Sequence, residues 1–260
     1  MVSVIRKRRE ELVLKERNVS ADLLGLLLSS QRANGGGANE DEAAPVLPLS
    51  DQLLMDECCT FLVAGHETTS NLLTWTMLLL SENPEWQRKA RKEVLSICGS
   101  NSLPEYEKIN SMKHIAMILY ESLRLYPPAP FLARRCTHHN VIGTIEVPPG
   151  VDVVVPVSHV HRKKELWGDD AHLFNPQRFA AGISKASCHP MAFLPFSVGP
   201  RTCIGQNFAL AEAKLILAGL LQRFSWSVAP GYRHCPEATL TLKPKYGLPL
   251  LLIAIETETE

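Results

Sequence analysis

The chain has 260 residues, of which 45% are apolar, and this is enough to bury the core of one large domain or two small ones. Its 27 basic and 27 acidic residues balance, so the overall charge argues against nucleic acid or another strongly charged partner. The seven cysteines are scattered without a C-x-x-C pair, which fits neither a secreted disulfide framework nor a zinc cage. We expect a globular protein of a reducing compartment.

The first part of the chain is predicted to form helices around a loop. Residues 3–31 have a helical pattern, and residues 34–44 (NGGGANEDEAA) have the glycine and acid content of a flexible loop. Ser50 is the expected N-cap of a helix that continues to about Ser81. This helix contains the longest apolar run, residues 58–80, whose polar interruptions favour a buried helix over a membrane span. The charged amino-terminal segment has no signal-peptide pattern and no anchor.

Two more helices are expected in the middle of the chain. Pro84 is a favourable first residue for one helix, which Gly99 ends, and residues 114–126 form another that stops before two prolines.

The second half is predicted to mix strands with one helix. Residues 141–147 and 151–157 are β-branched and are separated by the turn signal P-P-G, so they predict a small sheet. Residues 206–224 have a helical pattern. The tail, residues 240–255, has the pattern of two strands around a loop at residues 243–247.

The segment FSVGPRTCIG, residues 196–205, is the strongest candidate for a chemical site. Gly199 and Gly205 permit backbone turns denied to other residues, and the loop presents the sulfur of Cys203. Cys203 lies just before the helix predicted from Gln206, where unpaired N–H groups and the helix dipole stabilise a thiolate. A lone cysteine is more commonly a buried core residue. The position just before a helix favours a stable thiolate instead.

This segment resembles the cysteine loop of the cytochrome P-450 family, F-x-x-G-x-R-x-C-x-G, at every fixed position. The resemblance implies a mainly α fold with small β-sheets, the carboxy-terminal half of the cytochrome P-450 fold with its long central helix, haem-ligand loop and following helix. It implies that Cys203 is the axial thiolate of haem b and that Phe196, Gly199 and Gly205 help to bind the cofactor.

A second match, AGHETT, lies in the middle of the long predicted helix at residues 64–69. Gly65 and Thr68 are three residues apart and share a helical face. The resemblance implies that Gly65 lets the flat haem approach, and that Glu67 and Thr68 form an acid–alcohol pair that relays protons during oxygen activation. Without the cysteine loop, both side chains would be read as ordinary packed or solvated residues.

A third match concerns an ion network. Glu121 and Arg124 are spaced i, i+3, which any surface pair worth about 0.2–0.5 kcal/mol would also show. The family adds a second arginine, matched by Arg178 in FNPQRF, residues 174–179. The resemblance implies a triad that braces the haem-binding core. Family members often carry an acid where Gln177 stands, a small departure.

Two arginines are expected at the haem propionates. The resemblance assigns Arg201 of the cysteine loop and Arg134, because a forked guanidinium suits a carboxylate. Arg135 is adjacent and chemically equal, so the choice of Arg134 rests on the resemblance alone. His138 and His139 are expected to lie at the surface.

The resemblance, strongest to plant members, implies a haem-dependent monooxygenase. It would insert one oxygen atom from O₂ into a hydrophobic small molecule, with electrons from NADPH through a reductase. Full-length members lie on the cytosolic face of the endoplasmic reticulum membrane and are longer than this chain. Residues 1–260 are therefore interpreted as a partial haem domain without the amino-terminal half and its anchor.

Three alternatives stay open. The chain is an inactive or haem-poor truncated fragment, or a haem-thiolate isomerase or dehydratase, although such enzymes typically lose the acid–alcohol pair found here as Glu67-Thr68. A cysteine-nucleophile hydrolase would need a histidine poised beside Cys203, and the sequence points none there.

Overall fold

The computed structural model describes residues 2–14, 22–33, 50–100 and 104–255. The chain divides into two compact units, Met1–His66 and Glu67–Glu260, which are described one at a time. The flexible loop predicted at residues 34–44 lies outside the described residues. The described part is mainly helical with small antiparallel sheets, which confirms the predicted fold class.

The first unit consists of α1 (Val2–Leu14), α2 (Leu23–Ala33) and the beginning of α3 (Asp51–Glu82). Its small core joins one apolar side chain from each helix: Ile5, Leu28 and Leu54. The predicted N-cap is confirmed, because the Oγ of Ser50 accepts the Leu53 N–H over 3.1 Å.

Helix α3 has 32 residues and ends within one residue of the predicted position. Its burial changes along its length. Leu62 and Val63 are 62% and 56% exposed, whereas Leu72, Trp75 and Leu78 are almost fully buried. The prediction of a buried helix is therefore right only for its second half. No helix in the described ranges is both long and apolar enough to cross a membrane.

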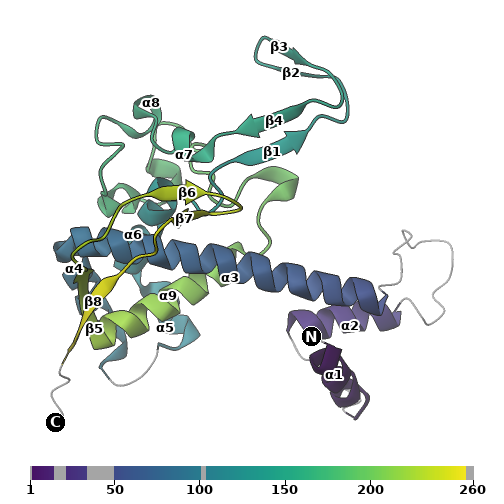
Figure 1. The fold of residues 1–260 in the computed structure, drawn as a ribbon, viewed down its shortest axis with the longest axis horizontal. Helices are drawn as coiled ribbons and strands as arrows, with labels where there is room; N and C mark the ends of the chain where they lie inside the picture. Colours follow the sequence, from purple (N-terminus) through teal and green to yellow (C-terminus); the bar gives the residue numbers. More distant parts are fainter. Residues whose placement is uncertain (1, 15–21, 34–49, 101–103, 256–260) are drawn as a thin grey trace. The chain divides into compact units, whose positions relative to one another are not determined.

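The second unit is built around one core. Helices α4 (Pro84–Cys98), α5 (Tyr106–Ser111) and α6 (Lys113–Leu125) all pack against α9 (Gln206–Arg223), as Figure 1 shows. Three of these helices match the predictions and α5 was not predicted. The segment between α6 and α9 adds two one-turn helices and three 3₁₀ turns: α7 (Val157–Val160), α8 (Lys164–Trp167), η1 (Pro176–Phe179), η2 (Ile183–Lys185) and η3 (Gly199–Arg201).

The strands of the described residues form four antiparallel pairs. These are β1 (Leu132–Arg135) with β4 (Asp152–Val155), β2 (Asn140–Ile142) with β3 (Ile145–Val147), β5 (Phe224–Val228) with β8 (Leu250–Ala254), and β6 (Pro236–Ala238) with β7 (Leu242–Pro244). In Figure 1 the β2–β3 hairpin extends beyond the β1–β4 pair. Opposite residues include Leu132 with Val155 and Trp226 with Leu252.

Two strand predictions are corrected by this pairing. Residues 141–147, predicted as one strand, turn back at Gly143, whose φ is 64°, and form a hairpin by themselves. Residues 152–155 pair instead with β1, a strand the sequence pattern did not predict. In the tail, β7 and β8 are present, but each pairs with a strand earlier in the chain. Periodicity indicates a strand without specifying its partner.

Candidate functional site

The cysteine loop, residues 196–205, leads directly into α9. Gly199 adopts φ 73°, the positive value expected of a glycine turn, and the Cys203 N–H donates to the Phe196 carbonyl over 2.8 Å. Phe196 is half-buried against the main core, whereas Cys203 is exposed. The loop is thus anchored at its start and presents its thiol outward at the amino end of α9.

Gly205 behaves differently from the prediction. Its φ of −86° and ψ of 5° are open to any residue, so the expected special turn is wrong. This position is distinguished by its short distance to the cysteine sulfur, because a Cβ built there would lie 3.9 Å from the Sγ of Cys203. A side chain at this point would contact the sulfur, and glycine leaves the space beside it open.

The side chains of Arg134 and Arg135 lie on opposite faces of β1. The Nη2 of Arg134 donates to the Oγ of Ser197 in the cysteine loop over 2.9 Å. Arg135 makes two 2.9 Å hydrogen bonds to the Asp152 carboxylate across the β1–β4 pair. Because successive strand residues point to opposite faces, only Arg134 reaches the cysteine loop. Arg201, also exposed, lies within the loop itself.

Ser197 was not singled out by the sequence. Among the described residues, it is the only non-glycine residue with positive φ, at 61°. Such backbone strain costs on the order of 1–2 kcal/mol and is commonly stored at functional sites. The side chain of this strained residue accepts the hydrogen bond from Arg134. Ser197 lies two residues before the turn at Gly199.

Several apolar side chains near Cys203 in the sequence are exposed. Ile204, next to Cys203, is 85% exposed, and Phe208, in the first turn of α9, is 72% exposed. Val198 in the same loop is 41% exposed. Exposed apolar side chains gathered at one place are typical of a surface that another molecule covers.

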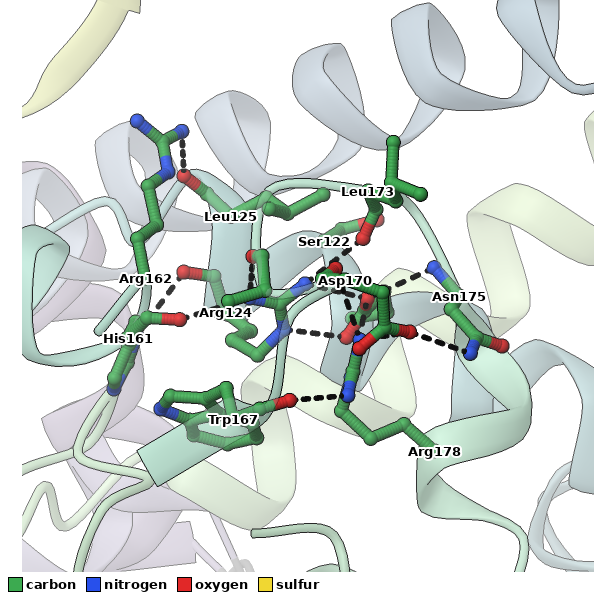
Figure 2. A network of polar contacts seen from close by, with 12 residues as sticks. Ser122, Arg124, Leu125, His161, Arg162, Trp167, Asp170, Leu173, Asn175 and Arg178 are labelled. Atoms are coloured by element: carbon green, nitrogen blue, oxygen red, sulfur yellow. Dashed lines mark hydrogen bonds and ion pairs between the residues drawn. The ribbon is translucent and has the colours of Figure 1, made fainter. Parts of the chain in front are cut away.

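Figure 2 shows a buried network of ion pairs and hydrogen bonds in the second unit. Glu121 and Arg124, both on α6 and fully buried, form a two-pronged pair with both N···O distances at 2.7 Å. The remaining N–H groups of Arg124 donate to main-chain carbonyls of His161, Ala171 and Leu173. All of the guanidinium donors are therefore used, as a buried charge requires.

Arg178 completes the predicted triad at longer range. Its Nε lies 3.7 Å from the Glu121 carboxylate, an ion-pair distance rather than a hydrogen bond. The Nη2 of Arg178 is closer to a second acid, Asp170, at 2.8 Å. Burial raises the pKa of Asp170, but hydrogen bonds from Asn175 and Arg178 outweigh it and lower that pKa below its usual value. The triad contacts are confirmed, and Asp170 is an addition.

His161 joins this network, through its contact with Arg124 drawn in Figure 2, to Leu194, two residues before the cysteine loop. Its Nε2 accepts the Leu194 N–H over 2.8 Å, so its Nδ1 carries the proton and donates to the Arg124 carbonyl over 3.2 Å. Burial lowers the pKa of His161 to about 4, which keeps the ring neutral at ordinary pH. Leu194 is two residues before Phe196, whose carbonyl receives the Cys203 N–H.

The predicted acid–alcohol pair lies on α3 in the second unit. Glu67 and Thr68 are both half-buried. The Oε1 of Glu67 accepts a 2.9 Å hydrogen bond from the hydroxyl of Thr241, near the carboxy-terminal end of the chain. Gly65 is a helical residue of the first unit with nothing within 4 Å of a Cβ built on it, and its place against a cofactor stays a prediction.

Local sequence motifs missed the residues that reach the site from elsewhere in the chain. His161 and Thr241 are common residue types in segments without a distinctive pattern, and Ser197 occupies an unspecified position of the cysteine-loop motif. Their contacts span 33, 63 and 174 residues respectively. The only available signal, the position of Ser197 inside the motif, specifies neither its conformation nor its partner. As predicted, His138 and His139 are exposed.

Comparison with known proteins agrees with this architecture. The model of the family described as cytochrome P-450 matches residues 1–250. The 11-oxo-beta-amyrin 30-oxidase of Glycyrrhiza uralensis is 46% identical over 96% of this chain and 47% of its own length. Cytochrome P-450 72A397 of Kalopanax septemlobus is 45% identical, and a cytokinin hydroxylase of Arabidopsis thaliana is 42% identical, each over 97% of this chain and 47% of its own length.

The chain belongs to the cytochrome P-450 family. It spans about half the length of the curated relatives it matches.

Proposed function

We propose that this chain carries the haem-thiolate centre of a monooxygenase, with Cys203 as the axial ligand of haem b. The observation that carries the proposal is the exposed thiol at the amino end of α9, with Ile204 and Phe208 exposed beside it. A cysteine whose main chain is held by a hydrogen bond, and whose neighbours in the sequence include exposed apolar side chains, fits a flat, largely apolar cofactor that is bound through sulfur.

The residues around the thiol also fit the rest of a haem. Gly205 leaves the space beside the sulfur free of a side chain, and Phe196 and Gly199 fix the loop that carries it. The guanidinium of Arg134 is directed to the same loop, and Arg201 is exposed within it. Both are suited to the propionates, because a forked guanidinium binds carboxylates in two-pronged geometry.

When bound, the thiolate-ligated haem supplies the activation of O₂ for insertion of one oxygen atom, with electrons from NADPH through a reductase. The residues of this chain supply protons. In our proposal the Oγ1 of Thr68 gives its proton toward the cofactor, and the Glu67 carboxyl replaces it from water. Half-burial of both side chains supports this role, since water reaches them while the protein orients them.

The substrate we propose is a hydrophobic small molecule. One relative is named an oxidase and another a hydroxylase, which supports oxidation as the reaction class. Retention of both Glu67 and Thr68 favours oxygen insertion over a haem-thiolate isomerase or dehydratase. For the longer proteins of this kind we propose the cytosolic face of the endoplasmic reticulum membrane.

The test is the absorption spectrum of the purified chain supplied with haem, reduced and exposed to carbon monoxide. We expect the thiolate-type Soret position in the wild type and its loss in Cys203→Ser, because an alcohol is a poor ligand. Cys188→Ser is the matched control, since Cys188 is also an exposed free cysteine. A Cys203→Ser spectrum identical to the wild type would refute the ligand assignment.

The alternative, that the chain is a haem-poor fragment, predicts a different result. It predicts substoichiometric haem in this chain and full haem occupancy in a version extended with the amino-terminal half of a relative. Stoichiometric haem in the 260-residue chain would exclude it.

A further inference from the structure

The proposed acid on α3 is contacted by a residue from the other end of the sequence. Thr241 lies in the turn between β6 and β7 and is 5% exposed. Its Oγ1 donates to the Oε1 of Glu67 over 2.9 Å, across 174 residues of sequence. A buried hydroxyl that donates to a carboxylate forms a charge-assisted hydrogen bond, which is shorter and stronger than a neutral one.

Asn71 fixes the direction of that hydrogen bond. Its Nδ2 donates to the Oγ1 of Thr241 over 2.9 Å and to the main-chain carbonyl of Glu67 over 3.0 Å. These two bonds use both amide protons, so the 3.4 Å approach to the Glu67 carboxylate is secondary. Because Thr241 accepts from Asn71, its single proton is directed to Glu67.

Leu242, the residue after Thr241, is held by hydrogen bonds at both of its main-chain groups. The Leu242 N–H donates to the Pro128 carbonyl over 2.9 Å, and the Trp75 indole N–H donates to the Leu242 carbonyl over 2.9 Å. Trp75 is one turn beyond Asn71 on α3, so two successive turns of the helix donate hydrogen bonds to the adjacent residues Thr241 and Leu242. The hydroxyl of Thr241 is therefore presented from a fixed main chain.

We propose that Thr241 is a positioning residue for the Glu67 carboxylate, with Asn71 orienting its hydroxyl. This inference rests on the proposed function, in which Glu67 replaces the proton given up by Thr68. With Oε1 held by Thr241, the carboxyl group exchanges its proton at Oε2. Each cycle then balances: Oε2 gives one proton to the Thr68 oxygen, Thr68 passes one proton on, and water restores the proton to Glu67.

The first test measures the hydrogen bond itself in the purified chain. The infrared difference between wild type and Glu67→Gln isolates the carboxylate band of Glu67. We expect Thr241→Val, which keeps the shape and removes the hydroxyl, to shift this band, and Thr241→Ser to restore it. The control is Thr76→Val, since Thr76 is equally buried on α3 but bonds only the Leu72 carbonyl. An unmoved band in Thr241→Val would overturn the inference.

The second test measures peroxide released per NADPH consumed in the haem-loaded protein. We expect Glu67→Gln to raise this ratio about tenfold, and Thr241→Val to give at least about half of that rise, with recovery in Thr241→Ser. If Glu67→Gln uncouples and Thr241→Val matches the Thr76→Val control, the inference is wrong and the proposed function stands. If Glu67→Gln has no effect, the proton-delivery role fails and this inference fails with it.

Discussion

The ion network around Arg124 and the cysteine loop are close neighbours in the second unit with opposite character. In the network, Glu121 and Arg124 are 0% exposed and every donor of the guanidinium has a partner inside the chain. In the loop, Cys203 is exposed, Ile204 is 85% exposed and Ser197 holds a positive φ. His161 bonds Arg124 through Nδ1 and, through Nε2, Leu194, two residues before the loop.

The contrast separates residues that stabilise the fold from residues that we propose bind a ligand. A buried, fully paired charge is costly to disturb, because any partner removed leaves another charge desolvated. An exposed thiol with exposed apolar neighbours contributes little to folding and leaves its surface for another molecule. The following substitutions should therefore have large effects in the network and small effects in the loop.

The largest effect is expected for Arg124→Met. The substitution leaves the buried Glu121 carboxylate without its two-pronged partner and removes the donors to three carbonyl groups. We expect the free energy of unfolding to fall by about 3–5 kcal/mol, measured by urea denaturation of the purified chain. Arg135→Met is the control, because that arginine forms its ion pair at the exposed surface. Equal losses in the two variants would contradict the assignment of a stabilising role to burial.

The next largest effect is a pH dependence of the unfolding free energy that arises from His161. The pKa of this ring is about 4 when folded and 6.5 at its ordinary value, because burial disfavours the charged form. Between these values the unfolded chain binds a proton that the folded chain does not, so stability falls as the pH drops from 6.5 to 4. The expected loss is about 3 kcal/mol, complete below pH 4.

The measurement is the unfolding free energy at several pH values for the wild type and for His161→Gln. The difference between their two pH profiles isolates the ring from the other titrating groups. A difference that stays constant between pH 6.5 and 4 would show that His161 is not held neutral.

A smaller effect is expected at Ser197, where the loop is strained. Both Ser197→Ala and Ser197→Gly remove the hydroxyl that binds Arg134, but only alanine must hold a side chain at φ 61°. The glycine variant should be more stable than the alanine variant by about 0.5–1 kcal/mol, by thermal unfolding. If alanine were the more stable replacement, the positive φ would not be maintained in solution.

The smallest effect is expected for Cys203→Ser in the chain without haem. An exposed side chain outside the core should change the unfolding free energy by no more than about 0.5 kcal/mol. The same variant should lose the thiolate-type spectrum, so stability and ligand binding separate at this residue. A large loss of stability would place Cys203 with the buried network instead.

Much of the fold was predictable because local signals specified it. Ser50 caps the start of α3 with its side chain, and Pro84 begins α4. The helix predicted at residues 206–224 is α9, Gln206–Arg223. Strand partners were not predictable. The pairing of β4 with β1 depends on contacts between distant segments that no local pattern encodes.

The sequence by itself determined the cysteine loop, the Glu121–Arg124 spacing and the AGHETT helix, because each is a short motif whose residues lie next to one another on a loop or a helical face. Only the tertiary structure decided which arginine reaches the cysteine loop, that His161 is neutral, and that Thr241 contacts Glu67. These facts arise from burial and from contacts across many residues, which exist only once the chain has packed.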